Sequence, residues 1–387
     1  MPSVVRVQVE PTVLRWARER SRIPEERLAI RFPKLAAWEA GEEQPTLKQL
    51  ESFASATHTP AGFLFLRVPP EESVPIPDFR TMARAGVERP SPDLLDTVYI
   101  CQQRQEWYIT YAQSIQEDPV AFVGSASVDD NIVEVAAAMR DTLGFGLAAR
   151  LQYSSWTGAL SGLSERAESA GVLVMVSGVV GSNTHRVLDP EEFRGFALSD
   201  PLAPLLFLNG ADTKAAQIFT LAHELAHLWI GTTALSNATA EIPGENTVER
   251  WCNQVAAELL VPLPAIREQY RGGSDLTEEL NRLAALFRVS TLVILRRVHD
   301  AGHLTRSQYR DAYEAEMERI LALDLDRSGS GGNFYNTLPI RASKRFTRAL
   351  IASTLGGRTL YQDAFRLLGF KKVSTLTELA KSLGVVA

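Results

Sequence analysis

The chain has 387 residues, of which 45% are hydrophobic and 22% are charged. These values exclude wholesale disorder and predict a globular protein of two to three domains. No apolar run approaches the roughly 18 residues that a membrane helix needs, the N-terminus lacks a signal-peptide pattern, and two cysteines, Cys101 and Cys252, cannot form a disulfide framework. We therefore expect a cytoplasmic protein that does not enter a membrane.

The net charge of −6 is distributed unevenly along the chain. Residues 331–387 hold nine basic and two acidic side chains, so the rest of the chain is strongly acidic. Such an asymmetry is typical of a surface that binds nucleic acid or an acidic partner. It is equally consistent with a basic C-terminal region that packs against the acidic remainder.

The first predicted elements are short helices between residues 11 and 66. Pro24 and Pro33 each mark the beginning of a helix. Thr46 followed by Gln49 forms a capping-box pattern, which predicts that a further helix begins there. The N-terminal region is therefore expected to be all-helical.

A proline-dotted stretch separates this region from the rest of the chain. Six prolines lie between residues 69 and 92, which predicts a linker or an extended arm. Helical character resumes over residues 93–116. Further on, short apolar runs bounded by Gly, Asp, Pro or Asn predict three β-strands. These strands cover residues 172–177, 195–199 and 205–208.

Helices dominate the remainder of the sequence. Asp212 is the expected N-cap of a helix that ends at Gly231, and Thr375 with Glu378 forms a further capping-box pattern. The other expected helices cover residues 129–143, 156–170, 247–261, 276–287, 290–300, 305–323, 341–355, 359–368 and 375–383. The sequence therefore predicts an α+β protein that is mostly helical and has a small central sheet.

The strongest chemical signal is His223-Glu224-x-x-His227 in the middle of a predicted helix. Residues four apart lie on one helix face, about 6 Å apart along the axis, so both imidazoles can reach one point, as zinc requires. Glu224 lies beside that point and can take a proton from activated water and pass it to a leaving amine. The pattern predicts a metallohydrolase site rather than a solvated helix face.

A catalytic zinc needs a third protein ligand and one open position. Glu249 is the expected ligand, because it lies 22 residues after the second histidine, enough for a loop and a returning helix. Asn253, one turn further on, is expected to hold a ligand histidine through its second nitrogen. Glu245 is a rival for ligation, Glu258 is a weaker one because it faces the opposite side of the helix, and Cys252 is expected to pack.

Four segments around this motif carry a family resemblance. The segments at residues 192–200, 204–209, 219–228 (FTLAHELAHL) and 249–262 resemble the ImmA/IrrE family of zinc metallo-endopeptidases. Together they cover roughly residues 130–265.

The resemblance implies a gluzincin-like zinc site. His223, His227 and Glu249 are then the ligands of Zn²⁺, with Mn²⁺ as a substitute in vitro, and Glu224 is the general base. The family cleaves helix-turn-helix repressors, so the resemblance also implies derepression of stress, phage or mobile-element genes. Zincins commonly bind substrate as an added strand, and residues 205–209 are read either as that sheet edge or as an internal strand.

Residues 11–66 resemble a Cro/repressor-type helix-turn-helix module, most closely in LAAWEAGEEQPTL (residues 35–47). Such a module presents its recognition helix to the major groove of DNA. Arg27, Arg31 and Lys34 are the expected nucleic-acid contacts. The alternative is a degenerate module that serves dimerisation or binds a protein partner.

Residues 283–298 also resemble a helix-turn-helix, and the alternative there is a helical hairpin packed on the peptidase. The predicted domains are a helix-turn-helix-like domain (1–68), a linker and helix (69–128), a zinc peptidase domain (129–265), a helical region (266–327) and a basic helical C-terminal region (333–387).

The sequence thus predicts a zinc endopeptidase that acts as a regulator, with a helix-turn-helix repressor as its protein substrate. The expected partners also include DNA, through the N-terminal module or the basic C-terminal region, and a second copy in a homodimer. The alternative is a DNA-binding regulator or antitoxin-like protein whose zinc site is silent or structural. An intact Glu224 argues against a purely structural site, because ligation alone does not need it.

Overall fold

The computed structural model describes residues 5–79, 89–236, 246–324 and 334–385. The chain forms two compact units. The N-terminal unit comprises Met1–Pro75 and Gly86–Val98, and the larger unit comprises Ile76–Ala85 and Tyr99–Ala387. Each unit has its own hydrophobic core.

The N-terminal unit is all-helical, as predicted. Its core is built around Trp16, Trp38 and Phe53, each less than one-twentieth exposed. The Thr46 side chain accepts a hydrogen bond from the Gln49 backbone N–H, and the Thr46 backbone N–H donates one to the Gln49 side chain, which confirms the capping box. Its helices are α1 (Pro11–Arg20), α2 (Glu25–Arg31), α3 (Leu35–Glu39), α4 (Leu47–Ala56) and the 3-10 helix η1 (Ala61–Phe65).

The larger unit contains a four-stranded sheet in the order β1-β3-β2-β4. β1 runs parallel to β3, whereas β2 runs antiparallel to both of its neighbours. The strands are β1 (Leu173–Ser177), β2 (Gly195–Leu198), β3 (Leu205–Asn209) and β4 (Ala234–Ser236). Three of them match the predicted strands, and β4 was not predicted. Because β3 lies between β1 and β2, the interpretation of residues 205–209 as a sheet edge is wrong.

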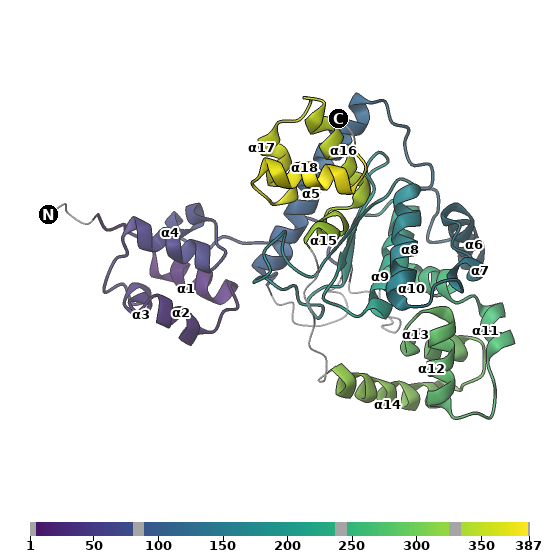
Figure 1. Ribbon diagram of the computed structural model, residues 1–387. Helices are drawn as coiled ribbons and strands as arrows, with labels where there is room; N and C mark the ends of the chain where they lie inside the picture. Colours follow the sequence, from purple (N-terminus) through teal and green to yellow (C-terminus); the bar gives the residue numbers. More distant parts are fainter. Residues whose placement is uncertain (1–4, 80–88, 237–245, 325–333, 386–387) are drawn as a thin grey trace. The chain divides into compact units, whose positions relative to one another are not determined.

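Helices surround this sheet. Figure 1 shows α8 and α9 on one face of the sheet and α15 on the other. The helices of this part of the chain are α5 (Pro92–Ser114), α6 (Ile132–Leu143), α7 (Leu147–Arg150), α8 (Trp156–Ser169), α9 (Lys214–Trp229), α10 (Thr247–Leu260), α11 (Leu263–Gln269), α12 (Leu276–Phe287), α13 (Thr291–Asp300), α14 (Arg306–Asp324), α15 (Phe334–Arg341), α16 (Lys344–Leu355), α17 (Tyr361–Leu368) and α18 (Val373–Ser382). The predicted α+β, mostly helical class is confirmed.

One apolar core joins the sheet to most of these helices. It includes Leu206 of β3, Leu221 of α9, Val255 of α10, and the α12 and α13 residues Leu283 and Ile294, all fully buried. Helices α12 and α13 therefore pack on the same core as the histidine-bearing helix, as the hairpin interpretation of residues 283–298 requires.

Two predicted helix caps are wrong. The N-cap of α9 is Thr213, whose side chain accepts from the Ala216 N–H at 3.2 Å, and not the preceding Asp212. Thr375 lies inside α18, which begins after Lys372 without a side-chain cap. The sequence pattern offers several Ser, Thr and Asp candidates near each helix start, so it cannot select among neighbours.

The basic C-terminal region contacts acidic groups of the peptidase part. Lys344 pairs with Glu165 at 2.8 Å, and Arg345 pairs with Glu117. Other cations of this region, namely Arg348, Arg358, Lys371 and Lys372, are exposed. The region therefore packs partly on acidic neighbours and also keeps a basic surface.

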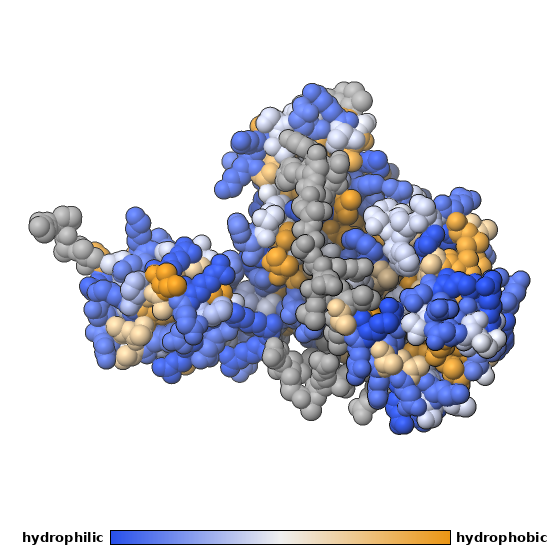
Figure 2. Space-filling view, turned by 60° about the horizontal axis from the view of Figure 1, so that its bottom comes forward, coloured by the Kyte–Doolittle hydropathy of each residue, from blue (hydrophilic) through white to orange (hydrophobic). Residues whose placement is uncertain are grey.

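Hydrophilic residues dominate the face of the molecule in Figure 2, with small apolar areas between them. Within the described residues, no helix combines the length and the apolar composition that crossing a membrane requires.

Candidate metal centre

Helix α9 carries both histidines of the motif into the interior. The helix has helix-forming residues throughout and a Thr213 cap that fixes its first turn. His223, Glu224 and His227 are fully buried, although all three are polar. Burial of three such groups on one helix is costly unless a partner compensates them.

Helix α10 supplies that partner. Asn246 caps the helix, and Glu249 lies in its first turn, where the helix dipole favours a carboxylate. The Glu249 oxygens lie 3.3 Å from Nε2 of His223 and 3.0 Å from Nε2 of His227. The two Nε2 atoms lie 3.1 Å apart. Three potential ligand atoms therefore converge on one point.

The donor set fits a zinc ion. Two imidazole nitrogens and one carboxylate oxygen are ligands that zinc prefers, and these groups lie within 4.8 Å of one another. Ligand atoms of a tetrahedral zinc site are separated by about 3.3 Å, given zinc–nitrogen distances of about 2.05 Å. The observed spacing of 3.0 to 3.3 Å matches this geometry. Three protein ligands leave a fourth position for water or substrate.

Asn253 fixes the orientation of one histidine. Its Oδ1 lies 2.9 Å from Nδ1 of His223, so this nitrogen donates to the amide oxygen and Nε2 is directed toward Glu249. An outer partner of this kind selects the tautomer that can bind a metal. The structure thus places Asn253 where the sequence predicted it.

Glu224 lies beside the cluster in an unusual state. Both of its carboxylate oxygens are buried and have no hydrogen-bond partner among the described residues. Burial, opposed by His223 and by the nearby Ser236 hydroxyl and aided by the charge of Glu249, raises the pKa of Glu224 to about 8. A buried carboxylate with unsatisfied oxygens next to a metal-binding cluster is suited to accept a proton.

The cluster also shifts the pKa of its own members. Burial alone would raise the pKa of Glu249, but the adjacent His223 and His227 hold it below its usual range. Burial opposes protonation of His223, yet Glu249 raises its pKa overall, whereas burial lowers the pKa of His227. A negative carboxylate therefore faces the two imidazoles.

Sequence reasoning missed three residues of this site. Ser236 of β4 lies 3.3 Å from Nε2 of His227, and the ring of Phe79 stacks on His227 with centroids 6.2 Å apart. A Cβ atom on Gly195 of β2 would meet Thr220 at 2.7 Å, so glycine is needed where α9 crosses the sheet. Ser236 and Phe79 lie in no recognisable motif, because their positions depend on strand pairing. Gly195 lies in the segment 192–200 that carries the family resemblance, but the sequence assigned it no role at the site.

The rival ligands lie elsewhere. Glu258 is buried at the other end of α10 and pairs with Arg297 of α13, so it is not near the cluster. Cys252 is fully buried in the apolar core, where burial raises its thiol pKa well above the usual value. Glu245 lies outside the described residues.

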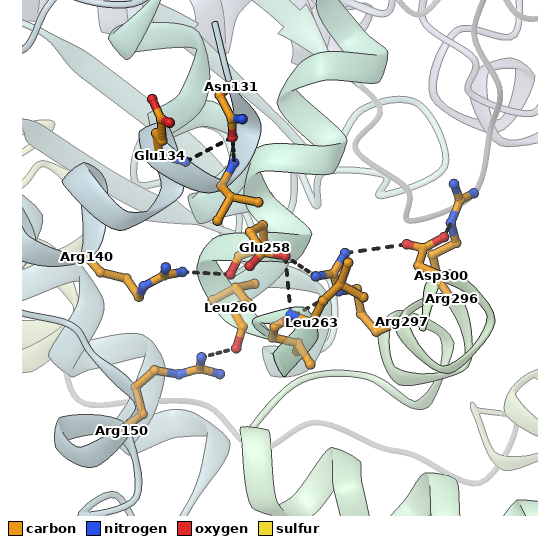
Figure 3. Close-up of polar contacts among 12 residues, drawn as sticks. Asn131, Glu134, Arg140, Arg150, Glu258, Leu260, Leu263, Arg296, Arg297 and Asp300 are labelled. Atoms are coloured by element: carbon orange, nitrogen blue, oxygen red, sulfur yellow. Dashed lines mark hydrogen bonds and ion pairs between the residues drawn. The ribbon is translucent and has the colours of Figure 1, made fainter. Parts of the chain in front are cut away.

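Figure 3 shows how the C-terminal end of α10 is fixed. Arg140 donates to the carbonyl oxygen of Glu258 at 2.8 Å, and Arg150 donates to that of Leu260. Arg297 donates to the carbonyl oxygen of Val261 at 2.8 Å. These guanidinium groups satisfy carbonyls that the helix end leaves free. They hold the helix that carries Glu249, so Arg297 has a structural use.

The predicted nucleic-acid contacts are at the surface of the N-terminal unit. Arg27, Arg31 and Lys34 are all exposed. Lys34 pairs with Glu43 at 2.7 Å, and Arg31 lies over the ring of Phe32. That these three residues contact nucleic acid stays a prediction.

Comparison with known proteins agrees with this site. Residues 167–299 match the family model of the IrrE N-terminal-like domain, peptidase M78. The match spans both histidines and Glu249, supports the resemblance to the ImmA/IrrE family and indicates a peptidase. Residues 342–382 match a domain of unknown function, DUF8813. No curated protein matches the chain.

Proposed function

We propose that the chain is a zinc-dependent endopeptidase. The observation that carries the proposal is the buried convergence of His223, His227 and Glu249 beside a Glu224 whose oxygens lack partners. A merely structural site would not require a buried, unpaired carboxylate next to its ligands.

The residues divide the chemistry among them. A zinc ion held by His223, His227 and Glu249 supplies a Lewis acid for the peptide carbonyl and lowers the pKa of water. Glu224 is placed to accept the proton that water loses on attack and to deliver it to the leaving amine. Asn253 keeps the His223 ring in its ligating orientation.

The proposed substrate is a helix-turn-helix repressor, whose cleavage derepresses stress, phage or mobile-element genes. This proposal is supported by the resemblance to the ImmA/IrrE family and by the match over residues 167–299. It assigns the chain a regulatory role in which the N-terminal unit helps to dock the substrate.

A matched pair of proteins tests the proposal. Wild-type and Glu224→Gln chains, each loaded with zinc, are incubated with the helix-turn-helix proteins encoded beside the gene and followed by intact mass spectrometry. We expect a defined cut by wild type and a rate lower by about 10²- to 10⁴-fold for the variant. Equal cutting by both proteins would indicate a contaminating protease.

A second candidate function is DNA binding by the N-terminal unit. A groove of about 380 Å³ there is lined by Arg31, Lys34 and Lys48, among others. Three cations around one groove suit a phosphate backbone. Binding of Glu224→Gln protein to its own promoter, lost on Arg31→Ala with Lys48→Ala, would support it. Promoter binding without any peptidase activity would favour the regulator with a silent zinc site.

A further inference from the structure

The outer edge of β4, which faces away from β2, lies alongside the metal-binding cluster. β4 pairs with β2 on its inner side, with Ala234 opposite Ala197 and Ser236 opposite Gly195. Ser236 contacts both His227 and Glu249, at 3.3 and 3.4 Å. A peptide strand added to the outer side of β4 would therefore lie next to the proposed zinc site.

A segment of the chain itself occupies this outer edge. We call residues 76–79 the linker strand, because they belong to the proline-dotted stretch. The Leu235 N–H donates to the Pro77 carbonyl at 2.9 Å, and the Phe79 N–H donates to the Leu235 carbonyl at 3.1 Å. The pairing is parallel. Prolines at positions 75 and 77 favour the extended backbone that such a pairing needs.

The linker strand also reaches the metal ligands. The Phe79 ring stacks on the His227 ring, with centroids 6.2 Å apart and planes inclined by 29°. His227 is fully buried, and the Glu249 side chain is only 13% exposed. Phe79 is thus one of the groups that cover the cluster.

This arrangement blocks the sheet edge at which an endopeptidase would bind its substrate. A substrate chain must approach the cluster, and peptide segments commonly bind by adding a strand to an open sheet edge. The backbone N–H and carbonyl of Leu235, which point to the outer side of β4, are already hydrogen-bonded to Pro77 and Phe79. A substrate strand at this edge has to replace the linker strand.

We propose that the linker strand is an internal ligand of the substrate-binding edge and competes with substrate. This inference rests on the proposed function. The substrate segment that replaces it is extended, accepts a hydrogen bond from Leu235 N–H, and places an aromatic side chain beside His227, two residues after the accepting carbonyl. Because the competitor is tethered, its effective concentration is in the millimolar range.

A binding experiment tests the competition without requiring proteolysis. Full-length, zinc-loaded Glu224→Gln protein serves as the parent, and the probe is a fluorescein-labelled peptide with the sequence of residues 73–80, SVPIPDFR. Phe79→Pro in this parent removes both the N–H that donates to Leu235 and the ring on His227. Fluorescence anisotropy should show at least about tenfold tighter peptide binding by Phe79→Pro than by the parent.

Controls separate the proposal from trivial effects. Phe79→Tyr keeps the N–H and a ring and should bind like the parent, and Phe79→Ala, which keeps both backbone bonds, should be intermediate. Circular dichroism and a zinc content of one per chain verify folding of each variant. Equal peptide binding by the parent and Phe79→Pro would overturn the proposal, as would no binding to a folded Phe79→Pro variant.

A last measurement distinguishes a competitor from a substrate. Intact mass spectrometry of zinc-loaded wild type should show an uncut chain, and a cut within residues 76–79 would also overturn the proposal. Failure of the peptidase proposal would appear differently, as wild-type protein that cuts no helix-turn-helix protein while the peptide results stand.

Discussion

Helix α10 carries a carboxylate near each end, and the two have opposite surroundings. Glu258 pairs with the guanidinium of Arg297 and accepts from the Leu263 N–H at 3.3 Å. Glu249 faces two imidazoles and lies near Glu224, whose oxygens have no partner in the described part of the chain. The first group is paired with a guanidinium, whereas the second faces only imidazoles, which are also possible metal ligands.

The contrast distinguishes a carboxylate that stabilises the fold, Glu258, from one that can bind a metal, Glu249. A guanidinium holds a fixed charge at every accessible pH, so the Glu258 end is permanently neutralised. An imidazole can be neutral and present a lone pair, so the Glu249 end can bind a metal. Each of the following variants changes one side of this comparison.

The largest effect is expected from Glu258→Ala. Removal of Glu258 leaves the buried Arg297 with only its longer ion pair to Asp300, at 3.5 Å, which should lower the free energy of unfolding by about 3 kcal/mol. The measurement is denaturant unfolding at pH 7 with EDTA, so that metal plays no part.

The matched control for this variant is the double change Glu258→Leu with Arg297→Met. It removes both charges and should recover part of the lost stability, because an apolar pair of similar volume is tolerated. The recovery should be incomplete, because the Val261 carbonyl loses its donor. A single variant within 1 kcal/mol of wild type would mean that the pair is not a structural element.

Glu249→Ala tests the other end of the helix. Loss of a direct ligand should lower zinc affinity by more than about 100-fold, beyond the effect of outer residues. The metal-free protein should also be less stable than wild type, because the buried His223 and His227 lose the carboxylate that faces them. Chelator competition measures the first quantity and unfolding in EDTA the second. An unchanged zinc affinity would show that Glu249 is not the third ligand.

Whether the sequence could predict a site residue depends on how far apart in the chain the interacting residues lie. The histidines and Glu224 follow from spacing within one helix, and Glu249 and Asn253 from one face of the next helix. The structure brings the two histidines, Glu249 and Asn253 together at distances of 2.9 to 3.3 Å. Local helical geometry was enough to propose the cluster.

Strand contacts were harder to predict. β4 has three residues, too few for a periodic pattern, and Phe79 reaches His227 through pairing between distant segments. β3 was a candidate edge because a short apolar run is compatible with either an internal or an edge position, and its complete burial identifies it as internal. Register and strand order depend on non-local packing that one sequence does not reveal.

Asn253→Ala is expected to weaken the metal site without removing a ligand. Loss of the 2.9 Å contact frees the His223 ring to adopt the wrong tautomer or orientation, so zinc affinity should fall by about 10- to 100-fold. The neighbouring Gln254 is exposed, and Gln254→Ala serves as the matched control with unchanged affinity. Equal affinities for both variants would show that the amide does not position the ligand.

The smallest effect is expected at another buried carboxylate, Glu279 of α12, which like Glu258 is paired with a guanidinium. Its pKa is lowered by the hydrogen bond from Arg282, with a further contribution from the Arg271 N–H at 2.8 Å. Because the folded-state pKa lies below the unfolded value, the contribution to stability is complete above the unfolded pKa and is lost as pH falls through the folded pKa.

Glu279→Gln should therefore lower the free energy of unfolding by about 1 kcal/mol at pH 7, and the difference from wild type should shrink in acid, below the ordinary glutamate value of about 4.3. Glu278→Gln, at an exposed neighbouring position, is the matched control. The Glu279 effect should be the same with zinc or with EDTA, because Glu279 is paired with a guanidinium and does not belong to the metal-binding cluster. An effect that depends on zinc would show that the Glu279 pair and the metal-binding cluster influence each other's stability.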